Sequence, residues 1–393
     1  MPAHLFSAFR RISGWTVVGL SMETTVEKNH VRPVARAGPV LRALAGVALA
    51  ILACEVLPGC NKGTDPKPLP KYLLYAATTA SGSSEGWVAV IDCATDSVID
   101  SISRGFQSEP GIVASPDGKY FAVLGSGRPP EIFDAVTRTQ IKYLSSPSIG
   151  PLFLPSARIV LSPGPDSTLV YDIPGFNLKE VWPRPQWDIE PVGSLGRFAS
   201  AKPTRPDPYP VEFVIFNPDG SPIDSFVISP DSDTLQVAPT FTFSPDGTRF
   251  YGVAFKGFRG GLACYDLISH TLLFFQRTNY SFRHCRVSPD GQEVWTTDPG
   301  DLHGFSPDHL GSIYVYDAFT GMLKDSVSVY YPGFNRTLMP WNIRFLPNSE
   351  KVYINCVGLQ PILAINTRTK KVERLIFPDF NRWALEIDLA PQP

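Results

Sequence analysis

Short apolar stretches separated by turn-forming residues recur along most of this chain. Between Arg286 and Val327, four such stretches are joined by a Ser-Pro-Asp-Gly turn at 288–291, a polar loop and a second turn at 317–321. Proline presets φ at the first turn position and glycine accepts the positive φ that follows, while Asp and Thr side chains can bond nearby backbone amides. The pattern predicts four short strands joined by three turns.

Both turns recur along the chain. The Ser-Pro-Asp-Gly turn has clean copies at 115–118 and 244–247 and degraded counterparts at 154–157, 193–196 and 346–349. Strand–turn–strand–loop–strand–turn–strand units of about 40–50 residues are typical of β-propeller blades. The second turn occurs at seven positions, spaced 38–51 residues apart: 92–95, 134–137, 172–175, 217–220, 266–269, 317–320 and 366–369.

The end of the chain predicts how a ring of such blades would close. The first unit, from Lys71, lacks an innermost strand, and the stretch 383–391 resembles that strand, with Pro391 where the turn proline belongs. Closure by this strand would remove free sheet edges between the two ends. The sequence therefore predicts an all-β, seven-bladed β-propeller of four-stranded antiparallel blades over residues 71–393, closed by the C-terminal strand joining the first blade.

The stretch Val-Ala-Val-Ile-Asp-Cys-Ala-Thr-Asp-Ser-Val-Ile at 88–99, together with the Ser-Pro-Asp-Gly turns, resembles the YVTN-type β-propeller repeat family. The resemblance covers about residues 71–393 and is weakest in the third and fourth units. It implies the propeller fold and an exported, lipoprotein-like member, since many members are bacterial exported or envelope proteins. The repeated motifs are turn chemistry, so they specify the fold and are nearly silent on function.

The composition is that of a globular protein. The chain of 393 residues has a net charge of −2, with 43% hydrophobic and 18% charged residues, and its 39 prolines and 31 glycines suit many turns. This charge balance argues against nucleic-acid binding and against attraction to an anionic membrane surface.

The first 53 residues resemble an export signal. Basic residues from Lys28 to Arg42 precede the apolar run 43–53, which is short for a membrane span, and Met22 is a candidate for the true start. Cys54 follows this run as in a bacterial lipoprotein box, and Cys60 is the alternative lipidation site. Simple cleavage and an uncleaved anchor are further alternatives. We expect a leader at 1–53, a lipidated, flexible tether at 54–70 and a location in the cell envelope, on the periplasmic or surface face of a bacterial membrane.

Four further cysteines lie within or next to predicted strands. They show no Cys-x-x-Cys spacing of the kind that indicates a metal or redox pair. Buried free thiols are the expected state, and disulfides are the alternative because an exported chain is able to form them. The four residues are Cys93, Cys264, Cys285 and Cys356.

The connections opposite the signature turns form the predicted recognition surface. In a propeller the signature turns define a lower face and the other connections an upper face, where ligands usually bind near the channel. Arg, Trp and Tyr dominate binding hot spots, and Arg also receives carboxylate or phosphate at two points. Alternatively, the aromatic residues pack between blades and the arginines pair with acidic residues. Candidates at the starts of the inner strands are Glu109, Asp188, Glu190, Arg283, His284, Trp341, Arg344, Arg382 and Trp383.

The sequence offers little for metal binding or catalysis. The loop 298–309 holds weak metal candidates, His303, Asp308 and His309, but their spacing matches no established ligand motif. His284 beside Cys285 is a nucleophile pair in name only, because neighbouring strand residues point to opposite faces. Glycine-rich phosphate loops, His-Glu-x-x-His and Gly-x-Ser-x-Gly are missing from the sequence. We therefore predict no metal, no cofactor and no catalytic residue.

Two functions fit these observations. The first is an envelope-anchored lipoprotein, expected to be a monomer, that recognises an envelope protein, a glycan or a small molecule through its upper face. The alternative is a propeller enzyme, lactonase-like or amine-dehydrogenase-like, with its site at the mouth of the central channel; analogy of fold alone motivates it. The missing catalytic motifs favour the binding module.

Overall fold

The propeller region is one compact unit, Pro68–Pro393. The computed structural model describes residues 71–393, except for the segments 81–85, 105–110, 126–127, 146–148, 155–157, 163–166, 183–186, 194–195, 204–210, 229–235, 257–258, 279–281, 301–310, 332–335, 358–360 and 379–381. Residues 1–70, with the predicted leader, both candidate lipidation sites and the tether, lie outside the described residues. Within the described ranges, no helix has both the length and the apolar character needed to cross a membrane.

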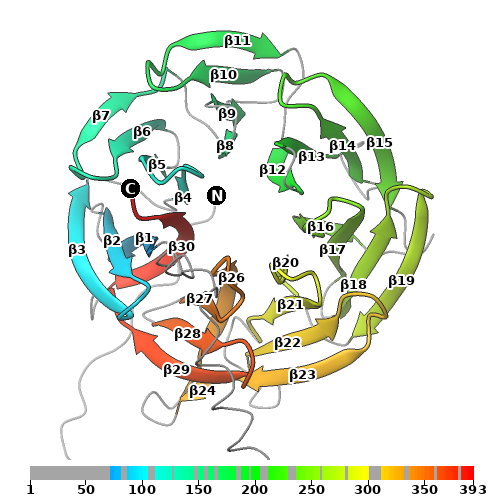
Figure 1. Cartoon of the computed structure of the whole chain (residues 1–393). Coiled ribbons are helices and arrows are strands. Elements are labelled where there is room, and N and C mark those ends of the chain that lie inside the picture. The colour runs from blue at the N-terminus through cyan, green and yellow to red at the C-terminus, as the bar shows by residue number, and fades with distance from the viewer. Residues whose placement is uncertain are drawn as a thin grey trace, which may run out of the picture. The chain divides into compact units, whose positions relative to one another are not determined.

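Seven four-stranded antiparallel sheets stand around a central axis, which confirms the predicted seven-bladed propeller (Figure 1). Listed from the axis to the rim, blade 1 is β30 (Arg382–Pro391), β1 (Tyr72–Ala80), β2 (Gly86–Asp92) and β3 (Ser97–Arg104); blade 2 is β4 (Gly111–Ala114), β5 (Tyr120–Gly125), β6 (Arg128–Asp134) and β7 (Gln140–Tyr143); blade 3 is β8 (Ile149–Leu154), β9 (Arg158–Ser162), β10 (Thr168–Asp172) and β11 (Leu178–Trp182).

The remaining blades repeat this arrangement. Blade 4 is β12 (Trp187–Val192), β13 (Arg197–Pro203), β14 (Val211–Phe216) and β15 (Pro222–Ile228); blade 5 is β16 (Gln236–Phe243), β17 (Arg249–Lys256), β18 (Arg259–Asp266) and β19 (Thr271–Thr278); blade 6 is β20 (His284–Val287), β21 (Glu293–Asp298), β22 (Ser312–Asp317) and β23 (Leu323–Ser328); blade 7 is β26 (Met339–Phe345), β27 (Lys351–Val357), β28 (Ile362–Asn366) and β29 (Lys371–Ile376). A small hairpin, β24 (Tyr330–Tyr331) and β25 (Arg336–Thr337), lies in the connection between blades 6 and 7.

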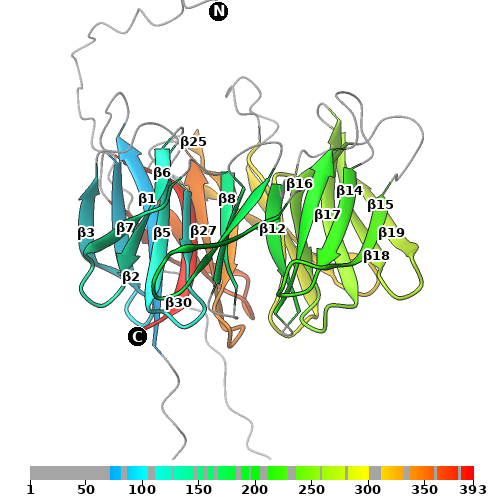
Figure 2. The ribbon, with the colours of Figure 1, turned by 90° about the horizontal axis from the view of Figure 1, so that it is seen from above.

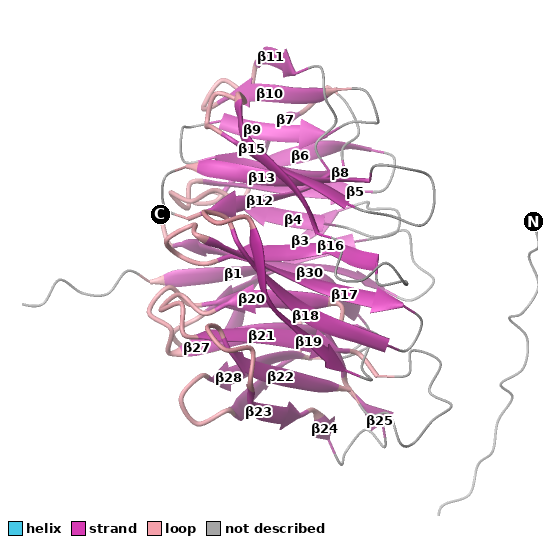
Figure 3. Cartoon of the chain, turned by 90° about the vertical axis from the view of Figure 1, so that its right-hand side faces the viewer, coloured by secondary structure: helices cyan, strands magenta, loops and turns pink. Residues whose placement is uncertain are grey.

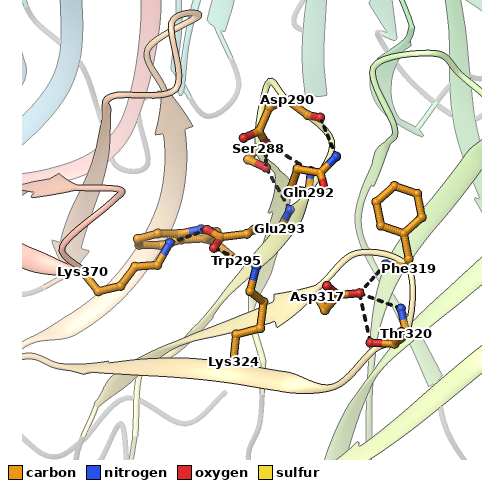
Figure 4. Close-up of polar contacts among 10 residues, drawn as sticks. All are labelled: Ser288, Asp290, Gln292, Glu293, Trp295, Asp317, Phe319, Thr320, Lys324 and Lys370. Carbon is orange, nitrogen blue, oxygen red and sulfur yellow. Dashed lines mark hydrogen bonds and ion pairs between the residues drawn. The ribbon is translucent and has the colours of Figure 1, made fainter. Parts of the chain in front are cut away.

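The turns of blade 6 show why the repeat folds as it does (Figure 4). The Ser288 hydroxyl donates to Asp290 at 2.5 Å and accepts from the Glu293 amide at 3.0 Å. The Asp317 carboxylate accepts from the amide and the hydroxyl of Thr320 at 2.9 and 3.0 Å. Gly291 has a φ of 72°, a region that residues with a Cβ rarely adopt. These acidic residues hold the turns, so their recurrence is explained by the fold.

The C-terminal strand closes the ring as predicted. β30 pairs with β1 from Tyr72 opposite Pro391 to Ala80 opposite Arg382, and Figure 1 shows the two ends of the propeller side by side in one blade. Gly118, in the lower turn of blade 2, approaches Pro391 so closely that a Cβ would lie 2.0 Å from its carbonyl oxygen. The ends of the chain are therefore tied into the sheet and into the next blade.

The contact between blade 7 and blade 1 is reinforced by a polar latch. The Tyr353 hydroxyl donates to Asp96 at 2.7 Å and to the carbonyl of Cys93 at 3.2 Å, and Lys351 pairs with Asp96 at 2.7 Å. These groups pack against an apolar layer of the two blades that includes Leu74. The four cysteines predicted to be buried thiols, Cys93, Cys264, Cys285 and Cys356, are buried and free.

Candidate functional site at the propeller axis

The strands run between two faces (Figure 2), and the short turns after the first and third strands of the blades gather on one of them, the lower face (Figure 3). The structure describes little of the predicted upper-face loops. Outside the described residues lie Glu109, His303, Asp308 and His309. In strands, but with only the backbone described, are Asp188, Arg382 and Trp383. The candidate residues whose side chains are described lie on the inner strands or directly before them.

Equivalent positions of the inner strands form an axial layer. Six of these residues stand three positions before a turn proline. Glu190 belongs to the same layer although its blade lacks the turn proline. Val192 pairs with Arg197 across a turn of the same length as the turn between Ser288 and Glu293, so Val192 aligns with Ser288 and Glu190 aligns with Arg286. Charged residues of the layer lie in blades 4, 6, 7 and 1, and uncharged ones lie in blades 2, 3 and 5. The axial layer consists of Val113, Leu152, Glu190, Thr242, Arg286, Arg344 and Asp388.

Arg286 and Glu190 form a two-point ion pair across the axis. Nη1 of Arg286 donates to Oε2 of Glu190 at 2.6 Å, and Nη2 donates to Oε1 at 2.8 Å. The pair joins blade 6 to blade 4, which are separated in the ring by blade 5, whose residue in this layer is Thr242. A two-point contact fixes the plane of the guanidinium as well as its position. About a fifth of each side chain is exposed, 21% and 22%, so water reaches the pair.

A second ion pair joins blade 7 to blade 1. Nε of Arg344 donates to Oδ1 of Asp388 at 2.8 Å, and the other carboxylate oxygen accepts from the Ala114 amide of blade 2 at 2.8 Å. Nη1 of Arg344 also donates to the carbonyl of Ile343 at 3.0 Å. Asp388 thus bridges three consecutive blades, and both of its oxygens are used by strong donors.

Arg283, His284 and Trp341 form a second group at the upper starts of β20 and β26. The Arg283 guanidinium carbon lies 5.5 Å from the Trp341 ring centroid, and the His284 ring lies 6.0 Å from it. The backbone of this group is held by threonines of neighbouring strands: Thr240 donates to the carbonyl of Arg283 at 2.5 Å and Thr297 to the carbonyl of Trp341 at 2.7 Å. The structure therefore brings three predicted site residues together, from two blades.

His284 is uncharged at neutral pH. Burial lowers its pKa, and the nearby guanidinium groups of Arg344, Arg286 and Arg283 lower it further, to about 3. A neutral imidazole keeps one N–H donor and one acceptor. Three guanidinium groups therefore lie near this ring, although burial is the larger cause of the lowered pKa.

Glu386 stands two residues before Asp388 on β30, on the same side of the strand. Its Oε2 accepts from the Ile112 amide at 3.3 Å. Burial is the main cause that raises the pKa of this carboxyl, to about 7. The positive charge of Arg344 opposes this rise, and the negative charge of Asp388 adds to it. A Cβ added to Gly111 would lie 2.8 Å from the same oxygen, so the glycine leaves the space that the carboxyl occupies.

Cys285 does not form a pair with its neighbour His284. Its thiol donates instead to the carbonyls of Tyr251 at 3.6 Å and Thr240 at 3.9 Å, both in blade 5. Burial raises its pKa to about 12, so it carries no thiolate at neutral pH. Among the described residues, no three or more His, Cys, Asp or Glu side chains are grouped to hold a metal ion.

Sequence reasoning misses half of the axial charges. Glu190, Arg283, His284, Trp341 and Arg344 are among the predicted residues, but Arg286, Glu386 and Asp388 are not, because the prediction considered only the upper starts of inner strands. The signal that finds Arg286 and Asp388 is the repeat itself. Counting back three residues from each turn proline gives Arg286, Arg344 and Asp388 directly.

Comparison with known proteins supports the fold. No family model matches the chain, and no curated protein does. A protein of unknown function from Desulfotomaculum acetoxidans is similar in structure (TM-score 0.57, 14% identity, 81% of this chain and 99% of that one). So is a 6-phosphogluconolactonase candidate from Bacteroides fragilis (0.53, 15%, 83% and 99%). The dihydro-heme d1 dehydrogenase NirN, solved in complex with DHE, is a further neighbour (0.51, 13%, 84% and 77%). At these identities the likeness shows a shared propeller fold.

Proposed function

We propose that this protein is a binding module whose propeller holds a small ligand bearing a carboxylate or phosphate at the upper end of its axis. The observation that carries the proposal is the group of Arg283, His284 and Trp341, in which a guanidinium and a neutral imidazole lie against one aromatic ring. A guanidinium receives an oxyanion at two points, and an indole offers an apolar surface to the body of a ligand. The three groups together suit a small molecule with an acidic end.

The charge of the axis supports an anionic ligand. Two arginines, Arg286 and Arg344, are engaged by Glu190 and Asp388. Arg283 adds a further positive charge, and all three arginines lower the pKa of His284, although burial is the larger cause. Because these side chains are partly buried, their charges act more strongly on a bound anion than they would in bulk water.

Calorimetric titration tests this function. A phosphorylated sugar acid, a small dicarboxylate and a neutral sugar would be titrated into the wild-type chain, Arg283→Ala and Trp341→Ala. We expect the two acidic compounds to bind and the neutral sugar not to bind, with at least about tenfold weaker binding in both variants. Arg374→Ala, an exposed change on β29, is the matched control. Equal affinity for charged and neutral compounds, or no effect of either variant, would contradict the proposal.

An enzyme acting at the same place is the second candidate. The observation that favours it is the Glu386 carboxyl, whose pKa of about 7 suits general acid–base chemistry at neutral pH. The descriptions of two structural neighbours as a lactonase candidate and a dehydrogenase fit this alternative. Hydrolysis of a lactone panel that Glu386→Gln abolishes would favour the enzyme. Lack of turnover, with no thermal stabilisation by calcium or zinc, would leave the binding module.

We also propose that the protein is exported and held at the cell envelope by a lipid on Cys54. The proposal is supported by the basic residues before the apolar run 43–53 and by the position of Cys54 directly after it. Mass spectrometry of the mature N-terminus should find a lipidated Cys54, and Cys54→Ala should release the protein from membranes, whereas Cys60→Ala should not. An unprocessed N-terminus would contradict it.

A further inference from the structure

Two carboxyl groups face the axis from one strand and have different partners. Glu386 and Asp388 are two residues apart on β30, so both side chains leave the strand on the same side. Asp388 receives a guanidinium N–H from Arg344 and the Ala114 amide, each at 2.8 Å. Glu386 accepts a longer hydrogen bond, from the Ile112 amide at 3.3 Å. The two groups therefore differ in how strongly their ionised forms are held.

Neighbouring charges reinforce this difference. From β26, Arg344 favours the ionised form of Glu386, but its Nε is bonded to Asp388. From β30 and β12, the negative charges of Asp388 and Glu190 oppose a third carboxylate. Gly111 and Ile112 of β4, which pack against the carboxyl, have no titratable side chain. When two neighbouring carboxyl groups have unequal surroundings, the better stabilised group stays ionised and the other holds a proton more readily. Here Asp388 is the better stabilised group.

The absence of a side chain at Gly111 leaves space for the Glu386 carboxyl. At Gly111 any larger residue would meet Oε2 of Glu386 at 2.8 Å and Cδ1 of Leu124 at 2.7 Å. Glu386 is partly buried, and 17% of the neighbouring Asp388 side chain is exposed, so solvent reaches this part of the axis.

We propose that Glu386 is the proton-bearing group of the axial site: as a carboxylic acid it donates a hydrogen bond to an anionic oxygen of the ligand, so that ligand and proton are held together. This rests on the proposed function, an oxyanion ligand, and adds the residue that selects for it. An ionised Glu386 would instead repel that oxygen. The ligand class is thus an acceptor-only oxyanion, such as a carboxylate, bound more tightly below neutral pH than above it.

Two measurements test this inference. Acetate and sulfate, which do not titrate between pH 6 and 8, would be bound to the full chain at both values and constant ionic strength. We expect about tenfold weaker binding at pH 8, the change in the protonated fraction of a group that titrates near 7. Glu386→Gln keeps a donor and cannot ionise, so it should bind equally at both values. Glu373→Gln, on the exposed edge strand β29, should behave as wild type.

The second measurement is a carboxyl ¹³C NMR titration without ligand, with the Glu386 signal assigned by its loss in Glu386→Gln. A midpoint near neutral pH is expected, and a midpoint below about 5, the range of an ordinary Glu, would overturn the inference. Anion binding that is equal at pH 6 and 8 would overturn it while leaving the proposed function in place. If neither anion binds at either pH, the proposed function and the ligand role of Glu386 both fail, whatever the NMR midpoint.

Discussion

Arg286 of blade 6 holds Glu190 of blade 4 by two hydrogen bonds of 2.6 and 2.8 Å, across a blade that contributes only Thr242 at that level. Propeller blades ordinarily contact their neighbours, so a link that passes over one blade constrains the ring from inside. The same pair fixes a guanidinium close enough to His284, a member of the proposed ligand site, to lower its pKa. It therefore connects the stability of the ring with the geometry of the site.

Breaking the Arg286–Glu190 pair on one side should destabilise the fold. Arg286→Met leaves the Glu190 carboxylate without its partner, and we expect a loss of about 1–3 kcal/mol, because the pair is partly exposed and a fully buried one costs more. Urea denaturation at pH 7 measures it. The double variant Arg286→Met/Glu190→Leu should recover much of the loss, whereas additive effects of the two changes would contradict the pairing.

The latch between blades 7 and 1 predicts a second stability effect. Tyr353→Phe removes a buried hydroxyl that donates to Asp96 at 2.7 Å, and should cost about 1–2 kcal/mol in urea denaturation. Tyr75→Phe is the matched control, because the Tyr75 hydroxyl is buried with no hydrogen-bond partner in the described part of the chain. That change should be neutral or stabilising. Equal losses in the two variants would show that the hydroxyl contact does not matter.

Ring closure predicts that the last strand is indispensable. A chain ending at residue 381 lacks β30, which exposes the edge of β1 and removes the axial carboxyl groups of Glu386 and Asp388. We expect loss of the cooperative unfolding transition and aggregation, measured by thermal denaturation and size-exclusion chromatography. Removing only the exposed Pro393 should leave both unchanged. A truncated chain that melts like the full one would argue against closure by β30.

Glu386 gives the stability of the protein a pH dependence of defined sign. Its folded pKa, about 7, lies above the ordinary value of 4.5, so the folded state binds more protons than the unfolded state between these values. Stability should therefore fall as pH rises from about 4.5 to about 7, by about 1–2 kcal/mol after allowance for partial exposure. Denaturation of the wild-type chain and Glu386→Gln across this range measures it. Parallel curves for the two proteins would rule out the assignment.

The fold could be predicted because its turns are held by hydrogen bonds between residues that are close in the sequence. Ser288 with Asp290, and Asp317 with Thr320, close their turns through contacts between residues two to five positions apart, so the sequence shows them directly. The closing strand was predictable for the same reason, since Pro391 occupies the turn position that the first unit lacks.

The axial site could be predicted only in part. Arg286 and Glu190 are 96 residues apart, and the turn of blade 4 has lost the Ser-Pro-Asp-Gly signature that would have aligned Glu190 with Arg286. The state of Glu386 depends on Gly111, on Asp388 and on an arginine of another blade, which no local pattern reveals. Arg283 and Trp341 were predicted from their residue types and their places at inner strand starts.

The position of a bound oxyanion tests the central claim most directly. Crystals of the full chain soaked with selenate would locate the ion through its anomalous scattering, independently of any assumption about the natural ligand. We predict a peak at the upper end of the axis, within hydrogen-bond distance of Arg283 or Glu386, that is lost in Arg283→Ala. Selenate bound only at the rim or the lower face, with none at the axis, would contradict the account.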